Sequence, residues 1–177
     1  MINTVFFDRD GVINEVVQRD GHFYSPRQLK DFKVRPDFIR LYRILEPMKL
    51  KMLVVSNQPD LARGLMSAEC LEEMNQVLLS QFHFLDIRYC THDDRDQCSC
   101  RKPKPGMLLE LMARYHLRTE EAMIIGDGWK DMEAGRQAGI KTVYLATPYN
   151  RSESVVSDYR VDCLDQIVTL PIFGGES

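Results

Sequence analysis

The chemistry of this sequence begins with two aspartates, Asp8 and Asp10, that flank Arg9 directly after an apolar run. If the backbone is still extended there, side chains two residues apart share one side, so both carboxylates face one way and Arg9 is turned away. Gly11 then allows a sharp turn. Two carboxylates this close repel each other, and hard oxygen ligands favour Mg²⁺, which also neutralises phosphate. The motif is equally typical of an ordinary turn after a strand, so the other segments of the chain must show whether it is a phosphate and magnesium site or only a turn.

Polar residues also follow a second apolar run. Ser56, Asn57 and Gln58 supply a hydroxyl group and amides that could bind phosphoryl oxygens, although a Ser-Asn pair alone is more typical of a helix cap. After a third run, Arg101 and Lys102 begin the segment RKPKPG, in which cations would offset phosphate charge and prolines stiffen the chain. A solvated basic loop is the alternative for that segment.

Two more carboxylates follow a fourth apolar run, in the segment GDGWKD. Asp127 and Asp131 are separated by one helical turn if Asp131 lies in the following helix. Asp127 would complete a magnesium site, with Asp131 bound to the ion directly or through a neighbouring group. A plain helix cap is the alternative, and for Asp131 alone it is the better one. Four strand ends that carry phosphate and magnesium chemistry in order nevertheless favour a phosphate-binding site.

Four soft metal ligands stand close together: Cys90, His92, Cys98 and Cys100. Three thiolates and one imidazole suit a tetrahedral, structural Zn²⁺ with no open position. A disulfide, a redox thiol pair or coincidence are the alternatives. Because Cys100 directly precedes Arg101, a zinc-stapled loop would fix the position of the neighbouring cations, and loss of zinc should harm activity without altering the chemistry.

Apolar periodicity indicates which elements position these residues. Short continuous apolar runs predict strands buried on both faces, at residues 4–7, 52–55, 87–90, 123–125 and 142–145. Between them the apolar period becomes helical, which predicts helices around residues 38–45, 71–82 and 108–115. The residues at the expected helix ends agree with these helices. Ser67 and Thr119 are expected as N-caps, Pro105 at a first helical position, and Gly139 after a helix that ends at Ala138.

This alternation predicts an α/β fold, a doubly wound, mostly parallel Rossmann-like sheet with helices on both faces and no separate cap domain. Ligands of such sheets bind outside the carboxyl ends of the strands, where the polar motifs stand. At 177 residues, we expect one domain over residues 1–173 with a flexible tail at 174–177. Residues 15–33 show weak periodicity, and their structure and role are left open.

Net charge and hydropathy limit the classes of partner that the protein could bind. The net charge of -3 argues against a broad field for nucleic acid or an anionic membrane, and no apolar stretch is long enough to span a bilayer. The N-terminus lacks the pattern of a secretion signal, so we expect a cytoplasmic protein. Nothing in the apolar pattern indicates an oligomer, and we expect a monomer that acts on a small phosphorylated metabolite.

The motifs DRDG, SNQ, RKPKPG and GDGWKD, in this order, resemble the four motifs of the haloacid dehalogenase superfamily of phosphatases. The resemblance implies Asp8 as nucleophile and Asp10 as general acid and base. It also implies Ser56 and Lys102 as phosphoryl stabilisers. Mg²⁺ would be held by Asp8, by the backbone carbonyl of Asp10 and by Asp127.

Within the superfamily, the zinc loop before RKPKPG, together with DRDGVIN and SNQPDLARG, resembles the D-glycero-D-manno-heptose 1,7-bisphosphate 7-phosphatases. Histidinol-phosphate phosphatases share such a loop and are the alternative, favoured by the short spacer between His92 and Cys98. Asp60 departs from the glycine usual in the heptose family. Arg101 would recognise the distal part of the substrate. A polynucleotide 3'-phosphatase or a non-catalytic scaffold are less favoured, the latter because both Asp8 and Asp10 are present.

Overall fold

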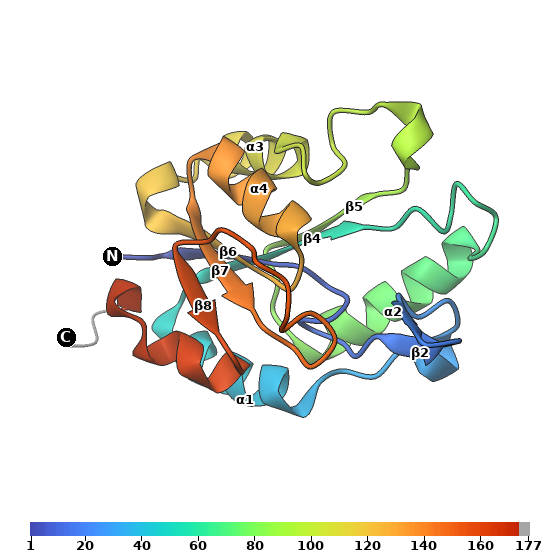
Figure 1. Cartoon of the computed structure of the whole chain (residues 1–177). Helices are drawn as coiled ribbons and strands as arrows, with labels where there is room; N and C mark the ends of the chain where they lie inside the picture. The colour runs from blue at the N-terminus through green and yellow to red at the C-terminus, as the bar shows by residue number, and fades with distance from the viewer. Residues whose placement is uncertain (174–177) are drawn as a thin grey trace.

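A six-stranded parallel sheet forms the centre of the protein in this computed structural model, which describes residues 1–173 (Figure 1). The strand order is β5-β4-β1-β6-β7-β8, and every neighbouring pair is parallel. The strands are β1 (Thr4–Phe7), β4 (Lys51–Asn57), β5 (Asp86–Cys90), β6 (Ala122–Gly126), β7 (Lys141–Leu145) and β8 (Tyr159–Val161). The predicted doubly wound parallel fold is therefore confirmed, with one strand, β8, that the sequence did not indicate.

Helices cover both faces of the sheet because alternate strand residues point to opposite sides. On one face, Phe7 and Val54 pack among the apolar side chains of α1 (Pro36–Leu45) and α2 (Ala68–Gln81). On the other face, Phe6 and Val55 pack against α3 (Gly106–Arg114) and α4 (Trp129–Ala138). Figure 1 shows α3 and α4 above the sheet and α1 below it. The central strands β1, β4, β6 and β7 are buried on both sides over most of their length, which is why they read as continuous apolar runs. The edge strands β5 and β8 are only partly buried.

Two of the expected helix boundaries are confirmed and two are wrong. Ser67 caps α2, since its Oγ accepts a hydrogen bond of 3.1 Å from the Cys70 amide. Gly139 follows α4 with φ 74°. Thr119 instead begins a short 3₁₀ turn that leads directly into β6, so no helix follows for it to cap. Pro105 stands one residue before the first residue of α3.

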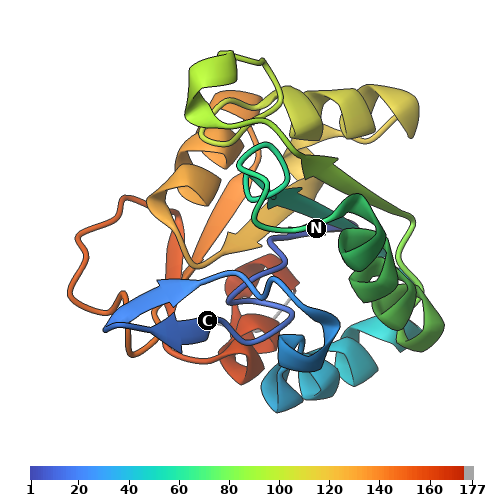
Figure 2. The same cartoon turned by 90° about the vertical axis from the view of Figure 1, so that its right-hand side faces the viewer.

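Residues 15–33 contain a two-stranded antiparallel hairpin, β2 (Val17–Arg19) and β3 (His22–Tyr24), and a 3₁₀ turn at Leu29–Asp31. Figure 2 shows the hairpin beside the loop that follows β7. Its strands are short and exposed, so no buried alternation marks them in the sequence. The expected tail at 174–177 lies outside the described residues. No helix in the described part of the chain combines the length and apolar character needed to cross a membrane.

The chain reverses direction across the sheet next to β1. It runs from β1 outward to β4 and β5, then returns to β6 on the other side of β1 and continues to β7 and β8. The carboxyl ends of β1 and β6 therefore form the point at which the strand order switches, where open α/β sheets bind their ligands. Asp8 follows β1 and Asp127 follows β6.

Candidate active site

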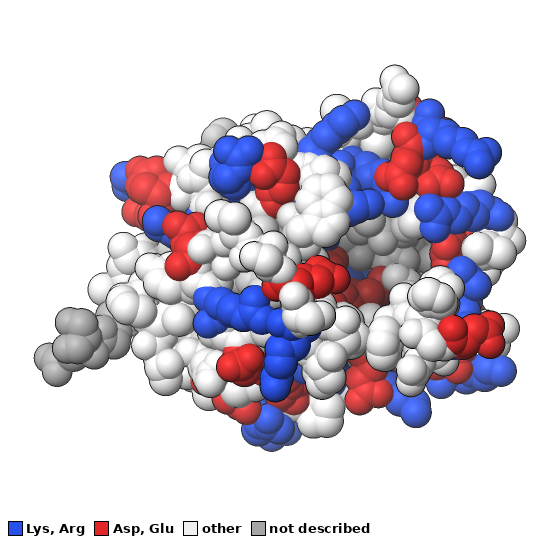
Figure 3. All heavy atoms as spheres, viewed as in Figure 1, with Lys and Arg blue, Asp and Glu red and all other residues white. Residues whose placement is uncertain are grey.

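A pocket of about 350 Å³ opens at this switch point. Figure 3 shows the hollow on one face of the protein, with acidic side chains at its floor and basic side chains along one rim. Seven of the residues expected from the sequence line it: Asp8, Asp10, Ser56, Asn57, Lys102, Asp127 and Asp131. Residues that are 94 to 123 positions from Asp8 thus meet it at one end of the sheet, because parallel strands present their carboxyl ends on the same edge.

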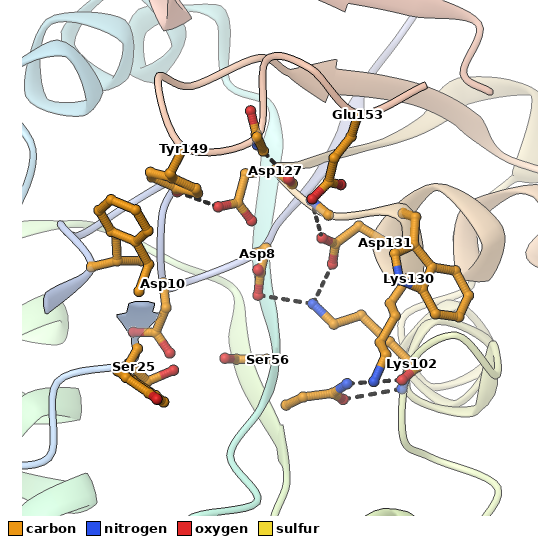
Figure 4. Close-up of a pocket in the computed structure, with 17 residues that line it drawn as sticks. Asp8, Asp10, Ser25, Ser56, Lys102, Asp127, Lys130, Asp131, Tyr149 and Glu153 are labelled. Carbon is orange, nitrogen blue, oxygen red and sulfur yellow. Dashed lines mark hydrogen bonds and ion pairs between the residues drawn. The ribbon is translucent and has the colours of Figure 1, made fainter. Parts of the chain in front are cut away.

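Lys102 is the buried cation at the centre of the pocket (Figure 4). Its Nζ donates to Asp8 Oδ1 at 2.8 Å and to Asp131 Oδ1 at 2.5 Å, and also to the Val55 carbonyl at 2.9 Å. Burial alone would lower the pKa of Lys102, but the charges of Asp131 and Asp8 raise that pKa above its ordinary value. Lys102 is therefore a fixed positive charge beside Asp8.

The Asp8 carboxylate keeps one oxygen free. Oδ1 accepts from Lys102 and, at 2.8 Å, from the Arg9 amide, whereas Oδ2 has no donor among residues 1–173. Burial, followed by the charge of Asp131, raises the pKa of Asp8 from 3.8 to about 7 despite the opposing effect of Lys102. Burial and the charges of Asp8 and Asp131 also raise the pKa of Asp127 well above its ordinary value. A further cation would relieve both effects.

A magnesium ion fits the donor set of the pocket. Asp8, Asp127 and Asp131 each offer a carboxylate oxygen, and these oxygens all lie within 4.8 Å of one another. With Asp10, four carboxylates have Lys102 and Arg9 as their bonded cations among residues 1–173, so when all four are ionised they exceed these cations by two charges. Hard oxygen ligands with an excess of two negative charges match a divalent cation.

Asp10 and Arg9 form a buried ion pair, so the prediction that Arg9 turns away from the carboxylates was wrong. Arg9 is fully buried, and its Nε and guanidinium NH2 donate to Asp10 at 3.0 and 3.1 Å. The reason is that β1 ends at Phe7 and the chain is already turning, with the Ile13 amide bonded to the Arg9 carbonyl at 2.8 Å. Two-residue alternation therefore does not apply at Arg9. Asp10 belongs to a separate hydrogen-bonded cluster, outside the three clustered carboxylates.

The residues at the end of β4 and directly after it mainly hold other site residues in place. Gln58 is buried, does not line the pocket, and donates through Nε2 to Asp10 at 2.7 Å and to Ser56 at 2.8 Å. Asn57 clamps the backbone of Lys102 with two hydrogen bonds, one of 2.9 Å to its carbonyl and one of 3.0 Å from its amide. Gln58 and Asn57 were both expected to contact substrate. Of these two residues Asn57 lines the pocket, as does Ser56, and Gln58 does not.

Arg101 lies beside the pocket without lining it. Its Nε donates to the exposed Asp94 at 2.7 Å, and a guanidinium nitrogen donates to the His92 carbonyl at 3.4 Å. Gly11 has φ 90° and lies against Asp127 and Tyr149, which line the pocket, so a side chain at this position would overlap both of them. The sharp turn expected at Gly11 is therefore combined with close packing against the Asp127 carboxylate.

The cysteine cluster has the dimensions of a metal site. Its sulfur–sulfur distances are 3.3 to 3.6 Å, and His92 Nδ1 lies 3.5 Å from the Cys90 sulfur and 3.4 Å from the Cys100 sulfur. Disulfide sulfurs would be ~2.0 Å apart, so the thiols are not paired in this way. Four ligands around zinc with bonds of ~2.3 Å would have sulfurs ~3.8 Å apart, close to the observed values. The cluster therefore fits a tetrahedral metal ion.

The loop after β7 contributes site residues that the sequence motifs did not indicate. Tyr149 donates a hydrogen bond to Asp127 Oδ2, and the buried Asn150 donates to the Asp127 carbonyl at 2.6 Å (Figure 4). Burial and the charge of Asp127 raise the pKa of Tyr149, so the hydroxyl stays protonated as a donor. The rule that ligands lie after strand ends applies to β7 as well, and would have pointed to this loop.

Comparisons with known proteins agree with this geometry. Residues 14–139 match the model of the haloacid dehalogenase-like hydrolases, a range that begins just after the Asp8 turn. A D-glycero-beta-D-manno-heptose-1,7-bisphosphate 7-phosphatase of Helicobacter pylori is 31% identical over 147 residues, covering 80% of this chain and 82% of that protein. A D-glycero-alpha-D-manno-heptose-1,7-bisphosphate 7-phosphatase of Campylobacter jejuni is 32% identical over 146 residues, covering 80% of each chain.

A solved structure supports the fold. The D,D-heptose 1,7-bisphosphate phosphatase of B. bronchiseptica, complexed with magnesium and phosphate, superposes with a TM-score of 0.80 at 24% identity, over 92% of this chain and 94% of that one. The match to the family model spans more than half of the chain, and the sequence relatives exceed 30% identity. The chain therefore belongs to the haloacid dehalogenase-like hydrolases.

Proposed function

We propose that this hydrolase is a magnesium-dependent phosphatase that removes the 7-phosphate of D-glycero-D-manno-heptose 1,7-bisphosphate. The observation that carries the proposal is the juxtaposition of Asp8, with one free oxygen, beside Lys102 and two further carboxylates in one pocket. The similarity to phosphatases of this sugar bisphosphate supports the substrate. Relatives named for both anomers occur, so the proposal covers either anomer.

In the proposed reaction, Asp8 Oδ2 attacks phosphorus, an aspartyl-phosphate forms on Asp8, and the bond from phosphorus to the sugar oxygen breaks. Asp10 gives a proton to the leaving sugar oxygen and then takes one from the water that hydrolyses the aspartyl-phosphate. The Asp10 carboxylate is bonded to Arg9, Asn14 and Gln58, so it would exchange one of these hydrogen bonds for the reacting oxygen.

The remaining charges and dipoles stabilise the transferring phosphoryl group. Ser56 and Lys102 line the pocket and would bind the oxygens of this group. The Ser56 hydroxyl would donate directly, and Lys102 Nζ would exchange one of its three present hydrogen bonds for a phosphoryl oxygen. Asn57 would act by holding the Lys102 backbone in place. Mg²⁺, held by Asp8, Asp127 and the Asp10 carbonyl with Asp131 in support, supplies a Lewis acid that offsets phosphate charge. Phosphate monoester hydrolysis is among the slowest uncatalysed reactions, which is why several such contributions are needed.

The cysteine cluster has a structural role in this proposal. Zn²⁺ bound by Cys90, His92, Cys98 and Cys100 would hold the loop from which Arg101 and Lys102 project. Arg101 would then recognise the distal phosphate or hydroxyls of the substrate. We propose one catalytic domain over residues 1–173, acting as a cytoplasmic monomer on a small metabolite.

The alternatives fit less well. Histidinol phosphate remains the second candidate, because the zinc loop resembles that of histidinol-phosphate phosphatases, but the relatives named above are heptose enzymes. A polynucleotide 3'-phosphate would need a broad basic surface, whereas this chain has a net charge of -3. A scaffold without catalysis would have no need of the buried Asp8–Lys102–Asp131 cluster.

The test measures phosphate release from both anomers of heptose 1,7-bisphosphate, histidinol phosphate, small sugar phosphates and a 3'-phosphorylated oligonucleotide. We expect the highest kcat/KM with one heptose anomer, dependent on Mg²⁺. Asp8→Asn should abolish turnover at nearly constant volume. Asp165→Asn, at the surface in a pair with Arg40, is the matched control. Preference for histidinol phosphate would refute the substrate, and a fully active Asp8→Asn variant would refute the covalent step.

A further inference from the structure

Asp127 differs from the other carboxylates of the pocket in its hydrogen-bond partner. Asp8 and Asp131 are bonded to Lys102, and Asp10 is bonded to Arg9. Within residues 1–173, the side chain of Asp127 receives a hydrogen bond only from the neutral hydroxyl of Tyr149. The orientation of this carboxylate therefore depends on Tyr149.

Tyr149 is itself held on two sides. Its ring lies over that of Phe23, at the hairpin, with centroids 4.8 Å apart and planes inclined by 31°. The next residue, Asn150, anchors the loop, since its Nδ2 donates to the carbonyls of Asp127 and Leu145 and its Oδ1 accepts from the Thr147 amide at 2.6 Å. The ring contact with Phe23 and the anchored Asn150 thus flank Tyr149, whose hydroxyl is directed at Asp127.

The turn at Gly11 closes the remaining space. A Cβ atom at Gly11 would overlap both Asp127 Oδ2 and the Tyr149 hydroxyl, so the two groups and the turn after β1 are in direct contact. Arg35 donates to the Gly11 carbonyl at 3.0 Å and holds this turn. The hydroxyl thus occupies one oxygen of Asp127 and leaves the other directed toward the carboxylates of Asp8 and Asp131.

We propose that Tyr149 is a positioning residue for the magnesium site, and that Phe23 couples it to the hairpin that borders the pocket. The Tyr149 hydroxyl fixes the rotation of the Asp127 carboxylate, so that one oxygen is presented to the cation before it binds. The proposal rests on the proposed function only for the identity of the cation. It assigns a role in metal binding to the hairpin β2–β3, which lies outside the four phosphatase motifs.

The test measures Mg²⁺ binding directly, by titration calorimetry on zinc-loaded protein without substrate. Tyr149→Phe removes the hydroxyl and retains the ring, and we expect the dissociation constant for Mg²⁺ to rise about tenfold. Phe23→Leu should produce a smaller rise, and the double variant should bind Mg²⁺ no more weakly than Tyr149→Phe alone, because Phe23 acts through the hydroxyl. At saturating Mg²⁺, kcat should be restored in each variant.

Tyr144→Phe is the matched control. It removes a buried hydroxyl that donates to the Asn150 carbonyl at 3.2 Å in the same loop but does not touch Asp127. We expect unchanged Mg²⁺ affinity in this variant. Unchanged or tighter Mg²⁺ binding by Tyr149→Phe would overturn the proposal, as would equal weakening by Tyr144→Phe. If wild-type protein binds Mg²⁺ but turns over no heptose bisphosphate, only the proposed substrate fails.

Discussion

Withdrawal of Mg²⁺, with zinc retained, should make the protein less stable as the pH rises from about 4 to about 7. In the metal-free protein, burial and the charge of Asp131 raise the pKa of Asp8 from 3.8 to about 7. The unfolded chain loses this proton near 3.8, so the folded state holds more protons across that window. The free energy of unfolding therefore falls with rising pH and becomes constant above the folded pKa. Asp127, whose pKa is also raised by burial, acts in the same direction.

The magnitude follows from the Asp8 pKa. A change from 3.8 to about 7 corresponds to about 4 kcal/mol of lost stability at most, and since the side chain is 14% exposed the measured loss should be smaller. For a chain of 177 residues, such a loss lowers Tm by roughly 10 °C. Bound Mg²⁺ stabilises the ionised carboxylates, so the loss should disappear when the ion saturates the site.

Thermal unfolding from about pH 5 to about pH 8 measures this effect, in buffers freed of Mg²⁺ by a resin and without a chelator that would also remove zinc. The quantity compared is the difference in Tm with and without Mg²⁺, which we expect to grow with pH. Asp8→Asn is neutral at every pH and should reduce the slope of the metal-free profile to the part that Asp127 contributes, whereas Asp165→Asn should leave the slope unchanged. A difference in Tm that is constant with pH would refute the reasoning.

Three further predictions concern the cysteine cluster, the turn at Gly11 and the binding of inorganic phosphate. Cys98→Ser should lose zinc by elemental analysis and reduce kcat/KM by about 100-fold at saturating Mg²⁺, because the loop that positions Lys102 loosens; retained activity without zinc would contradict a positioning role. Gly11→Ala should abolish Mg²⁺ binding in calorimetry, because the new side chain would overlap Asp127. Gly64→Ala is the control: Gly64 has φ 69° and open space around it, so the variant has a similar backbone strain without the overlap and should still bind Mg²⁺. Inorganic phosphate should raise Tm only when Mg²⁺ is present, and stabilisation by phosphate alone would contradict the charge balance of the pocket.

The sheet could be predicted from the sequence because its four central strands, β1, β4, β6 and β7, are buried on both faces and appear as apolar runs. The edge strand β5 is only partly buried but still carries apolar residues that indicated it. β8 could not, since it has only three residues and places Arg160 between Tyr159 and Val161. The hairpin β2–β3 is short and has no buried residue, so no alternation of apolar and polar residues marks it in the sequence. Thr119 has the residue type of a cap, but β6 begins three residues later and leaves no room for a helix.

The candidate site was predictable where one strand end supplies each group, as for Asp8, Lys102 and Asp127. Contacts between side chains of adjacent loops could not be predicted from the sequence. Arg9 is buried against the rings of Phe32 and Tyr89, at 5.4 and 6.0 Å, and nothing in its local sequence indicates these partners. Such pairings depend on how loops pack, which a local pattern does not encode.

The charges of the pocket also determine the order in which it is filled. When Asp8, Asp10, Asp127 and Asp131 are all ionised, they exceed Lys102 and Arg9 by two negative charges, so a phosphate dianion that approached them without a metal ion would meet net repulsion. A divalent cation brings the balance to zero, after which the phosphoryl group can approach Asp8 Oδ2 with Lys102 already in place. The fixed parts of the site, the strand ends and the cysteine loop, hold the cations and the nucleophile. This charge balance predicts that Mg²⁺ would bind before or together with substrate, and Tyr149, proposed to orient Asp127, would then act on that binding step.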